Sequence, residues 1–315
     1  MRIVTFDDVR GLGISPVQCF KWVEEALKHK NEAFLPAKIS IKPDIPGVFY
    51  NTMPSVLPWT GYAGVKLVTR YPDRTPALES QILLYSISDG RLLALMDGTW
   101  ITTMRTGAVA AHSIELFAKR DYRTMGIIGL GNTAAATLSV LLARNPNREL
   151  SIKLLEYKDQ HIRFAQRFED YSNVRFSFVA SPEDAVKGCD VVVSAATVLD
   201  RDVCADDCFD PGVVVVPIHT RGFTNCDLFF DKVYADDTAH VKGFKYFDRF
   251  RSFAEVFDVI EGSAHGRDSD EERILVYNIG ISLHDIFFAG KVYESLNPGD
   301  GKNISFDPDL EKFWV

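Results

Sequence analysis

The sequence has few cysteines and no long apolar run. Its five cysteines are an odd number in 315 residues, and only Cys204 and Cys208 lie close together. No histidine or second cysteine pair completes a tetrahedral zinc site with them, so we expect free thiols and no metal centre. No stretch reaches the roughly 18 apolar residues of a membrane span. The first residues carry acids early and lack the apolar core of a signal peptide, so we expect a cytoplasmic protein.

The sequence also lacks an excess of positive charge. Its net charge of −8 argues against nucleic acid or an anionic membrane as a partner. Hydrophobic residues make up 46% and charged residues 25%, as in packed globular proteins. The length exceeds that of one ordinary core, which predicts two domains. Any cationic groups that bind a small anionic substrate must therefore be single lysines or arginines within apolar segments.

The first third of the chain predicts a mixture of helices and strands. Residues 15–33 begin with Ser15 and Pro16, an N-cap and a first-turn proline, and continue with apolar residues at helical spacing. Residues 34–60 are expected to be extended chain rich in proline, and residues 99–119 to form a helix. Strands are expected at 65–71, 81–87 and 91–97, the last two joined by a hairpin turn.

After residue 121, short apolar runs alternate with helical segments, which predicts a parallel sheet covered on both faces. Strands are expected at 125–131, 150–156, 174–180, 190–196, 212–218 and 232–237. Helices are expected at 133–145, 161–170 and 181–188. Residues 272–296 are expected to form one long helix with a glycine at 280, and the tail after Leu296 is expected to be loose.

The strongest chemical signal is the motif GIIGLGNTA at 126–134, which lies between an apolar strand and a helix. Gly129 permits a tight turn, and Gly131 lets backbone amides approach a pyrophosphate at the positive end of the helix. Ala134 takes the place of a third glycine. The alternative is a glycine-rich turn without a nucleotide, but the strand–turn–helix context favours a dinucleotide. The cofactor contacts expected from this loop are Gly129, Gly131, Asn132 and Thr133.

Three later strand ends are expected to face the same cofactor, because ligands bind beyond the carboxyl ends of parallel strands. Glu156 would accept hydrogen bonds from the adenosine ribose and repel a 2′-phosphate, which favours NAD over NADP. Lys158 could instead pair with that phosphate, so NADP stays possible. Ala195 and Thr197 are small enough for a cofactor ring to approach. His219 either contacts cofactor or substrate or is an ordinary loop histidine.

Two cations outside the glycine motif are candidates for substrate contacts. Lys66 lies between Val65 and Leu67 in an apolar strand, so its side chain points to the opposite face from both. That face is either polar or part of a site, and the sequence leaves both open. Arg105 lies in a helix of small residues, where its planar guanidinium suits a carboxylate held bidentately. A surface ion pair is the alternative for Arg105.

Together these features resemble the ornithine cyclodeaminase/μ-crystallin family along nearly the whole chain. The resemblance implies a Rossmann doubly wound parallel sheet at 119–282, binding NAD(P). That sheet would be inserted in an α+β domain for substrate binding and dimerisation, formed by 1–118 and 283–315. The resemblance also implies a homodimer. The segments that carry the resemblance are Met53-Pro54, GYAGVKLVTRYP at 61–72, LLALMDGTWITTMRTGAVAA at 92–111, GIIGLGNTA, DVVVSAAT at 190–197, DKVYADD at 231–237 and NIGISLHDI at 278–286.

The resemblance also implies residue roles. Lys66 matches the family's active-site lysine, which contacts the substrate amino group, and Arg105 matches the arginine that clamps the substrate carboxylate beside the cofactor. Lys38 stands where the family usually has an arginine, and Met53 lies in a matching segment on the substrate side. Cyclodeaminases carry a loop acid after the strand ending at 218. Here gap-free alignment places Arg221 at that position, and the nearest acid, Asp227, is the candidate catalytic replacement.

The implied activity is hydride transfer at the carbon that bears nitrogen in a small amino or imino acid. Reactions in the family include deaminating cyclisation of ornithine to proline, alanine dehydrogenation, cyclic ketimine reduction and opine-type synthesis. The displaced loop acid weighs against ornithine cyclisation and leaves the other reactions as alternatives. A protein of another class, a non-catalytic NAD(P)-binding protein of μ-crystallin type, is the further alternative.

Overall fold

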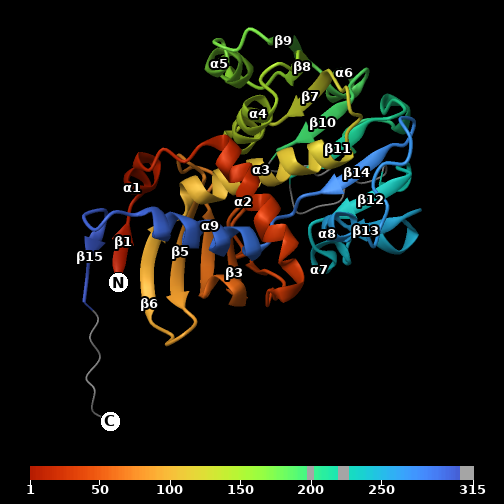
Figure 1. The fold of residues 1–315 in the computed structure, drawn as a ribbon. Helices are drawn as coiled ribbons and strands as arrows, with labels where there is room; N and C mark the ends of the chain where they lie inside the picture. Colours follow the sequence, from red (N-terminus) through yellow and green to blue (C-terminus); the bar gives the residue numbers. More distant parts are fainter. Residues whose placement is uncertain (197–201, 219–226, 306–315) are drawn as a thin grey trace. The chain divides into compact units, whose positions relative to one another are not determined.

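A computed structural model describes residues 1–196, 202–218 and 227–305 of the chain (Figure 1). The chain divides into two compact units, which we describe separately. The first unit contains Met1–Ile14, Glu32–Thr102 and Ser282–Val315, and the second contains Ser15–Asn31 and Thr103–Ile281. No helix in the described part of the chain is long and apolar enough to cross a membrane.

The two units group the chain differently from the predicted division, which placed residues 15–31 and 103–118 with the first domain. Helix α2 (Pro16–Lys28) packs against α4 (Asn132–Arg144) and α8 (Val256–Glu261) of the second unit. Most of α3 (Thr99–Phe117) belongs there too. A Cβ added to Gly107 would lie 2.5 Å from that of Ala136, so α3 crosses α4 very closely at this glycine.

The first unit is built on a seven-stranded sheet in the order β15-β1-β6-β5-β4-β3-β2. Strands β2 to β6 are antiparallel neighbours, whereas β1 runs parallel to β6. The strands expected at 65–71, 81–87 and 91–97 are confirmed as β4, β5 and β6. The elements are β1 (Arg2–Val4), α1 (Phe6–Gly11), β2 (Ile39–Ile41), β3 (Phe49–Leu57), β4 (Tyr62–Arg70), β5 (Leu78–Ser86), β6 (Leu92–Asp97), α9 (Ser282–Ser295) and β15 (Lys302–Asn303).

Helix α9 lies against strands β3, β4 and β5 of this sheet, and two glycines permit its close approach to β4. A Cβ added to Gly64 on the strand would lie 2.7 Å from Cδ1 of Ile286 on the helix. A Cβ added to Gly290 on the helix would lie 2.6 Å from the ring of Tyr62 on the strand. Neither position has room for a larger residue, so the distance between α9 and β4 is set by these two contacts.

The second unit is built on an eight-stranded sheet in the order β13-β12-β14-β11-β10-β7-β8-β9, with every strand pair parallel. This confirms the predicted doubly wound sheet, whose central strands are runs of buried β-branched residues. Its strands are β7 (Thr124–Ile128), β8 (Leu150–Leu155), β9 (Val174–Val179), β10 (Val191–Ser194), β11 (Val214–Pro217), β12 (Lys232–Ala235), β13 (Phe253–Glu255) and β14 (Ile274–Tyr277). Its remaining helices are α5 (Gln160–Arg167), α6 (Pro182–Val186) and α7 (Thr238–Val241).

The prediction of one helix across residues 272–296 is wrong. Ile274–Tyr277 forms β14, which lies between β11 and β12 in the sheet. The chain then turns at Gly280, whose φ is +90°, and α9 begins at Ser282. A short apolar run buried on both faces has no periodicity that separates a strand from a helix, which explains the error. The expectation of a loose tail after Leu296 is also wrong in part, because β15 pairs with β1.

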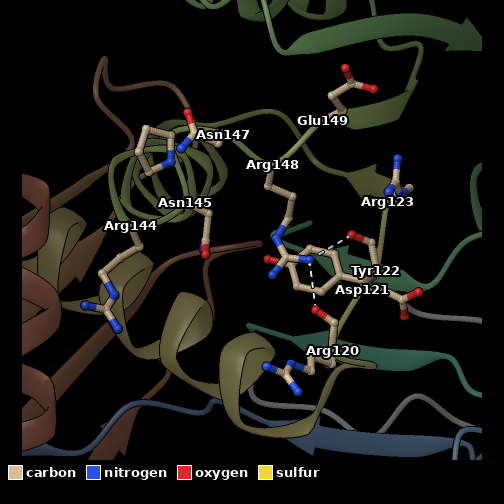
Figure 2. Close-up of a pocket in the computed structure, with 10 residues that line it drawn as sticks. Arg120, Asp121, Tyr122, Arg123, Arg144, Asn145, Asn147, Arg148 and Glu149 are labelled. Carbon is tan, nitrogen blue, oxygen red and sulfur yellow. Dashed lines mark hydrogen bonds between the residues drawn. The ribbon is translucent and has the colours of Figure 1, made fainter.

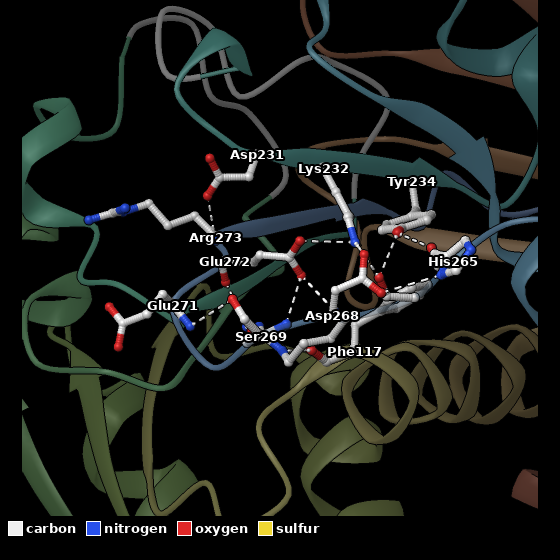
Figure 3. Close-up of polar contacts among 12 residues, drawn as sticks. Phe117, Asp231, Lys232, Tyr234, His265, Asp268, Ser269, Glu271, Glu272 and Arg273 are labelled. Carbon is white, nitrogen blue, oxygen red and sulfur yellow. Dashed lines mark hydrogen bonds and ion pairs between the residues drawn. The ribbon is translucent and has the colours of Figure 1, made fainter.

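A network of polar contacts fixes the chain segment that leads into β14 (Figure 3). Lys232 forms ion pairs with Asp268 at 2.6 Å and with Glu272 at 3.0 Å. Burial works against the charge of Lys232, but hydrogen bonds to these carboxylates raise its pKa. Arg267 donates to the backbone carbonyl of Phe117 at 2.7 Å and thereby satisfies the C-terminal end of α3. The network therefore connects β12, α3 and the entry to β14.

Asp190 joins the amino ends of β7 and β10, the strands whose other ends carry the glycine motif and Ala195. Its carboxylate accepts hydrogen bonds from the backbone amides of Arg123 at 2.9 Å and Thr124 at 3.0 Å, and Lys119 lies 2.6 Å away. Burial alone would raise the pKa of Asp190, but these donors lower it from 3.8 to about 2. The carboxylate thus sets the register of the two strands.

We predict that Asp190→Asn lowers the free energy of unfolding by about 2 kcal/mol at pH 7. Because the pKa of Asp190 is depressed in the folded protein, its contribution is present above about pH 4 and is lost as the pH falls towards 2. Urea unfolding of both proteins between pH 7 and pH 2 measures this convergence. Asp170→Asn, at an exposed acid, is the control and leaves stability unchanged. A pH-independent difference would contradict the assignment.

Candidate functional site

The glycine motif forms the tight turn from β7 into α4 that the sequence predicts. Gly129 has a φ of +85°, and a Cβ there would lie 2.5 Å from the backbone nitrogen of Ala196. The backbone amide of Ala195 donates to the carbonyl of Ile128 at 2.7 Å. Gly129 is therefore required by the protein itself, for its left-handed backbone and for the close approach of the chain that leaves β10.

Gly131 differs from Gly129, because nothing in the described structure requires a glycine there. Its φ is −86°, and a Cβ added to it would have no atom within 4 Å. It is the N-cap of α4, a 13-residue helix, and its position provides no side-chain hydrogen bond to the first turn. The amides that begin α4 thus adjoin open space at the positive end of the helix dipole. This geometry fits an anionic group such as a diphosphate.

The side chains that begin α4 divide between surface and core. Asn132 is exposed and Thr133 is half-buried, so both lie near the open space beside Gly131. Ala134 is fully buried, which matches its expected role in the packing of the helix on the sheet. The loop therefore combines a rigid inner face with an accessible outer face.

Other predicted cofactor residues lie at the same edge of the sheet. β7 has β8 and β10 as its two neighbours, so the carboxyl ends of these strands are adjacent. Glu156 follows β8 with an exposed side chain, and its backbone amide donates to Val179 at 2.9 Å. The ammonium of Lys158 lies 5.3 Å from the ring of Tyr157. Ala195 directly follows β10. The predicted contacts Thr197 and His219, together with Arg221, lie outside the described residues.

Asp227 lies in the apolar core of the second unit. It is 2% exposed, and the hydroxyl of Tyr277 donates to its carboxylate at 2.5 Å. Tyr277 itself is fully buried and contacts the ring of Phe244 edge-on. These contacts are those of an acid that holds β14 in place. The catalytic role expected of Asp227 stays a prediction, and its surroundings favour a structural one.

Arg105 is buried, with 5% of its surface exposed, which excludes the solvent-exposed ion pair left open by the sequence. Its guanidinium lies against Gly280, where an added Cβ would be 2.7 Å from Nη1. The backbone amide of Gly280 donates to Asp236 at 2.5 Å. Sequence reasoning missed Asp236, although an acid at the carboxyl end of a buried strand was a usable signal. Arg105 and Asp236 therefore meet at the same glycine of the second unit.

Lys66 in the first unit lies on the buried face of β4, not on a polar one. It is fully buried, and its Nζ donates to Oδ1 of Asp285 on α9 at 2.7 Å. Met53 is its direct neighbour on β3 and Ile82 its direct neighbour on β5. Asp285 was not singled out from the sequence, although a single acid within the apolar run of α9 was a usable signal. The remaining candidate, Lys38, is half-buried and precedes β2.

A hollow of about 1010 Å³ lies elsewhere in the second unit, at the amino ends of β7 and β8 (Figure 2). Among its arginines, Arg148 stabilises the fold. The guanidinium of Arg148 donates to the carbonyls of Arg120 and Tyr122 at 3.1 Å each and lies 4.1 Å from the centre of the Tyr122 ring. Because ligands of parallel sheets bind at the carboxyl ends of the strands, we do not place the cofactor here.

The fold and the glycine loop together define a doubly wound α/β protein. The model of the ornithine cyclodeaminase/mu-crystallin family matches residues 2–300. The chain therefore belongs to this family, as the sequence resemblance predicted. In the part of the chain that the structure describes, no group of three or more His, Cys, Asp or Glu residues is placed to hold a metal ion.

Curated relatives cover most of the chain at modest identity. The nodulation efficiency protein NfeD of Rhizobium meliloti is 27% identical over 93% of this chain and 95% of its own length. The alanine dehydrogenase of Archaeoglobus fulgidus is 28% identical over 96% of this chain and 98% of its own. The Δ1-pyrroline-2-carboxylate reductase of Bacillus cereus is 26% identical over 81% of this chain and 84% of its own.

A solved structure agrees with this relationship. The structure of an archaeal alanine dehydrogenase dimer with bound NAD is similar to this one with a TM-score of 0.86. The two sequences are 26% identical, and the match covers 98% of this chain and 99% of the other. The likeness therefore extends over both units.

Two substitutions of similar size at Gly131 can test whether a diphosphate binds in the open space beside it. We predict that Gly131→Asn and Gly131→Asp both keep the stability of the protein, since both residues are strong N-caps in this backbone conformation. Both also fill the same space, but only Asp adds a charge. The Asp variant should bind a dinucleotide at least about tenfold more weakly than the Asn variant, because its carboxylate repels the diphosphate. Calorimetric titration with NADH and NADPH measures the difference.

Gly129→Ala is the structural counterpart of these variants. It should lose roughly 1–3 kcal/mol of stability, because the left-handed backbone and the close contact with Ala196 both exclude a Cβ.

Equal dinucleotide affinity in the wild type and both Gly131 variants would show that no diphosphate lies at this loop.

Proposed function

We propose that this protein is an NAD(P)-dependent enzyme that acts on the carbon–nitrogen bond next to the carboxylate of a small amino or imino acid. The observation that carries the proposal is the open space at Gly131 beside the uncapped start of α4. The names of the relatives add the reaction class, because alanine and pyrroline-2-carboxylate both have nitrogen on the carbon next to a carboxylate. A reduced nicotinamide, when bound, supplies a hydride to such a carbon, and the oxidised form accepts one.

The glycine loop of the second unit supplies the proposed cofactor contacts. Backbone amides at the start of α4 hold the diphosphate, and Glu156 accepts hydrogen bonds from the ribose. Its negative charge disfavours a 2′-phosphate, which makes NAD the expected cofactor and NADP the alternative. The residues to which we assign cofactor contacts are Arg105, Gly129, Gly131, Asn132, Thr133, Glu156, Ala195, Thr197 and His219.

The proposed substrate contacts use the two buried cations. Arg105 holds the substrate carboxylate, because a guanidinium can donate two parallel hydrogen bonds to it, and Lys38 assists. Met53 adds an apolar contact beside Lys66. Lys66 donates a proton to the substrate nitrogen during imine reduction and accepts one in the reverse direction. Asp227 is the weaker candidate for proton transfer, because Tyr277 already donates to its carboxylate in the core.

The proposal predicts turnover by the purified protein with NADH in a screen of cyclic imino acids, 2-oxo acids with ammonia, and ornithine with NAD. Lys66→Ala should lower kcat at least about 100-fold on the best substrate, as loss of a general acid does, while the affinity for NADH stays unchanged. NADH absorbance and calorimetry measure these quantities. Dinucleotide binding without turnover on any substrate would support a binding protein instead. Full turnover by Lys66→Ala would refute the role of this lysine.

We further propose a cytoplasmic homodimer that forms through the first unit. The edge strand β2 carries Ile39 and Ile41 on one face, and both are 59% exposed. Phe34 and Ile45 near the same strand are also more than half exposed. Exposed apolar side chains gathered on an edge strand are a common basis for self-association. The similar structure of an archaeal alanine dehydrogenase is described as a dimer, which supports the proposal that this protein is also a dimer.

The dimer proposal predicts that Ile39→Lys/Ile41→Lys halves the mass measured by analytical ultracentrifugation at micromolar concentration. Two buried charges at an isologous interface appear twice in the dimer, which makes the penalty severe. Ile162→Lys on α5 is the control, because it charges an exposed apolar residue of the second unit. A monomeric wild type, or an unchanged mass in the double variant, would contradict the proposal.

A further inference from the structure

The pair of Lys66 and Asp285 is the most deeply buried ion pair in the described part of the first unit. Both side chains have no exposed surface, and their charged atoms lie 2.7 Å apart. The pair joins β4 to α9 through two residues that are 219 positions apart in sequence. Its geometry depends on the close approach of α9 to β4 that Gly64 and Gly290 permit.

A buried ion pair of this kind is poorly explained by stability. Removing two charges from water costs more than their attraction returns unless the geometry is excellent, and apolar replacements of similar volume are often at least as stable. The surrounding positions on the same face, Met53 and Ile82, are apolar and would accommodate such replacements. The charges at Lys66 and Asp285 therefore call for a functional reason.

We propose that Asp285 is a positioning residue that holds the Nζ of Lys66 in place and keeps it protonated. This inference rests on the proposed function, in which Lys66 delivers a proton to the substrate nitrogen. Burial alone favours neutral lysine, whereas a carboxylate at hydrogen-bond distance favours the ammonium form. An ammonium has three donors, so a bond to Asp285 is compatible with a second contact to a substrate.

Lys66 has neighbours on three elements of the first unit. β3 contributes Met53 and β5 contributes Ile82, neither of which is charged. α9 contributes the carboxylate of Asp285, and His284 is buried next to it on the same helix. A histidine is neutral at the alkaline pH where lysine titrates, so His284 adds no charge beside this carboxylate there.

The decisive experiment compares pH profiles of imine reduction by the wild type and Asp285→Asn. The substituted amide retains an oxygen that can accept from Nζ but has no charge. We expect kcat to fall at least about tenfold. We also expect the alkaline limb of the profile to move to lower pH by at least about one unit, because Lys66 loses its proton more easily. An unmoved alkaline limb in a folded Asp285→Asn protein would overturn the inference.

Two further variants separate positioning from mere folding. Glu294→Gln removes a charge from the exposed end of α9 and should leave kcat and the pH profile unchanged. Asp285→Glu keeps the charge, so it should keep the alkaline limb of the wild type, with a lower kcat because the longer side chain displaces Nζ. If Asp285→Asn does not fold, Asp285→Glu carries the test, and a limb shifted to lower pH would contradict the inference.

A measurement without turnover distinguishes failure of this inference from failure of the proposed function. Selective ¹⁵N labelling of lysine allows the ammonium of Lys66 to be titrated by NMR, with its signal assigned by its loss in Lys66→Met. The signal should persist to higher pH in the wild type than in Asp285→Asn, whether or not a substrate has been found. An inactive wild type with this shift would refute the proposed function alone, whereas equal titration in both proteins would refute the role of Asp285.

Discussion

The second unit depends on one close approach, between the turn at Gly129 and the chain that leaves β10. No side chain fits between them, so the carboxyl ends of β7 and β10 are held at a fixed separation. At the other ends of the same strands, Asp190 fixes the register through backbone amides. With both ends fixed, the amides that begin α4 keep their direction without a ligand. A binding site organised in this way loses little conformational entropy when an anion arrives.

In the first unit, too, close contacts at glycines fix the position of a candidate functional group. Its central contact is between a helix and a strand, and two glycines on opposite partners set the distance between α9 and β4. At this distance the carboxylate of Asp285 reaches Nζ of Lys66. A larger residue at Gly64 or Gly290 would move α9 outward and lengthen the distance between the two charges. The two glycines therefore bear on the geometry of the ion pair.

The sequence predicted the features that depend on local chain chemistry. The parallel sheet, the tight turn at Gly129 and most strands and helices were recognisable from apolar runs, glycines and caps. The features it could not settle depend on partners distant in sequence. β14 was mistaken for helix because a doubly buried run has no period, and the face of Lys66 stayed open because its partner Asp285 is 219 residues away. Arg105 and Asp236 both lie against Gly280, an arrangement that no local pattern reveals.

In the proposed function, the protonation of Lys66 bears on which form of the substrate binds. An amino acid near neutral pH carries an ammonium group, which a protonated lysine repels in a site of low dielectric. An imine nitrogen can instead accept a hydrogen bond from Lys66 and then its proton. A lysine kept charged by Asp285 therefore favours binding of the imine over the amine. Binding of the amine becomes favourable only at higher pH, where the substrate ammonium loses its proton. Under the proposed function, the buried carboxylate thus favours binding of the imine at neutral pH.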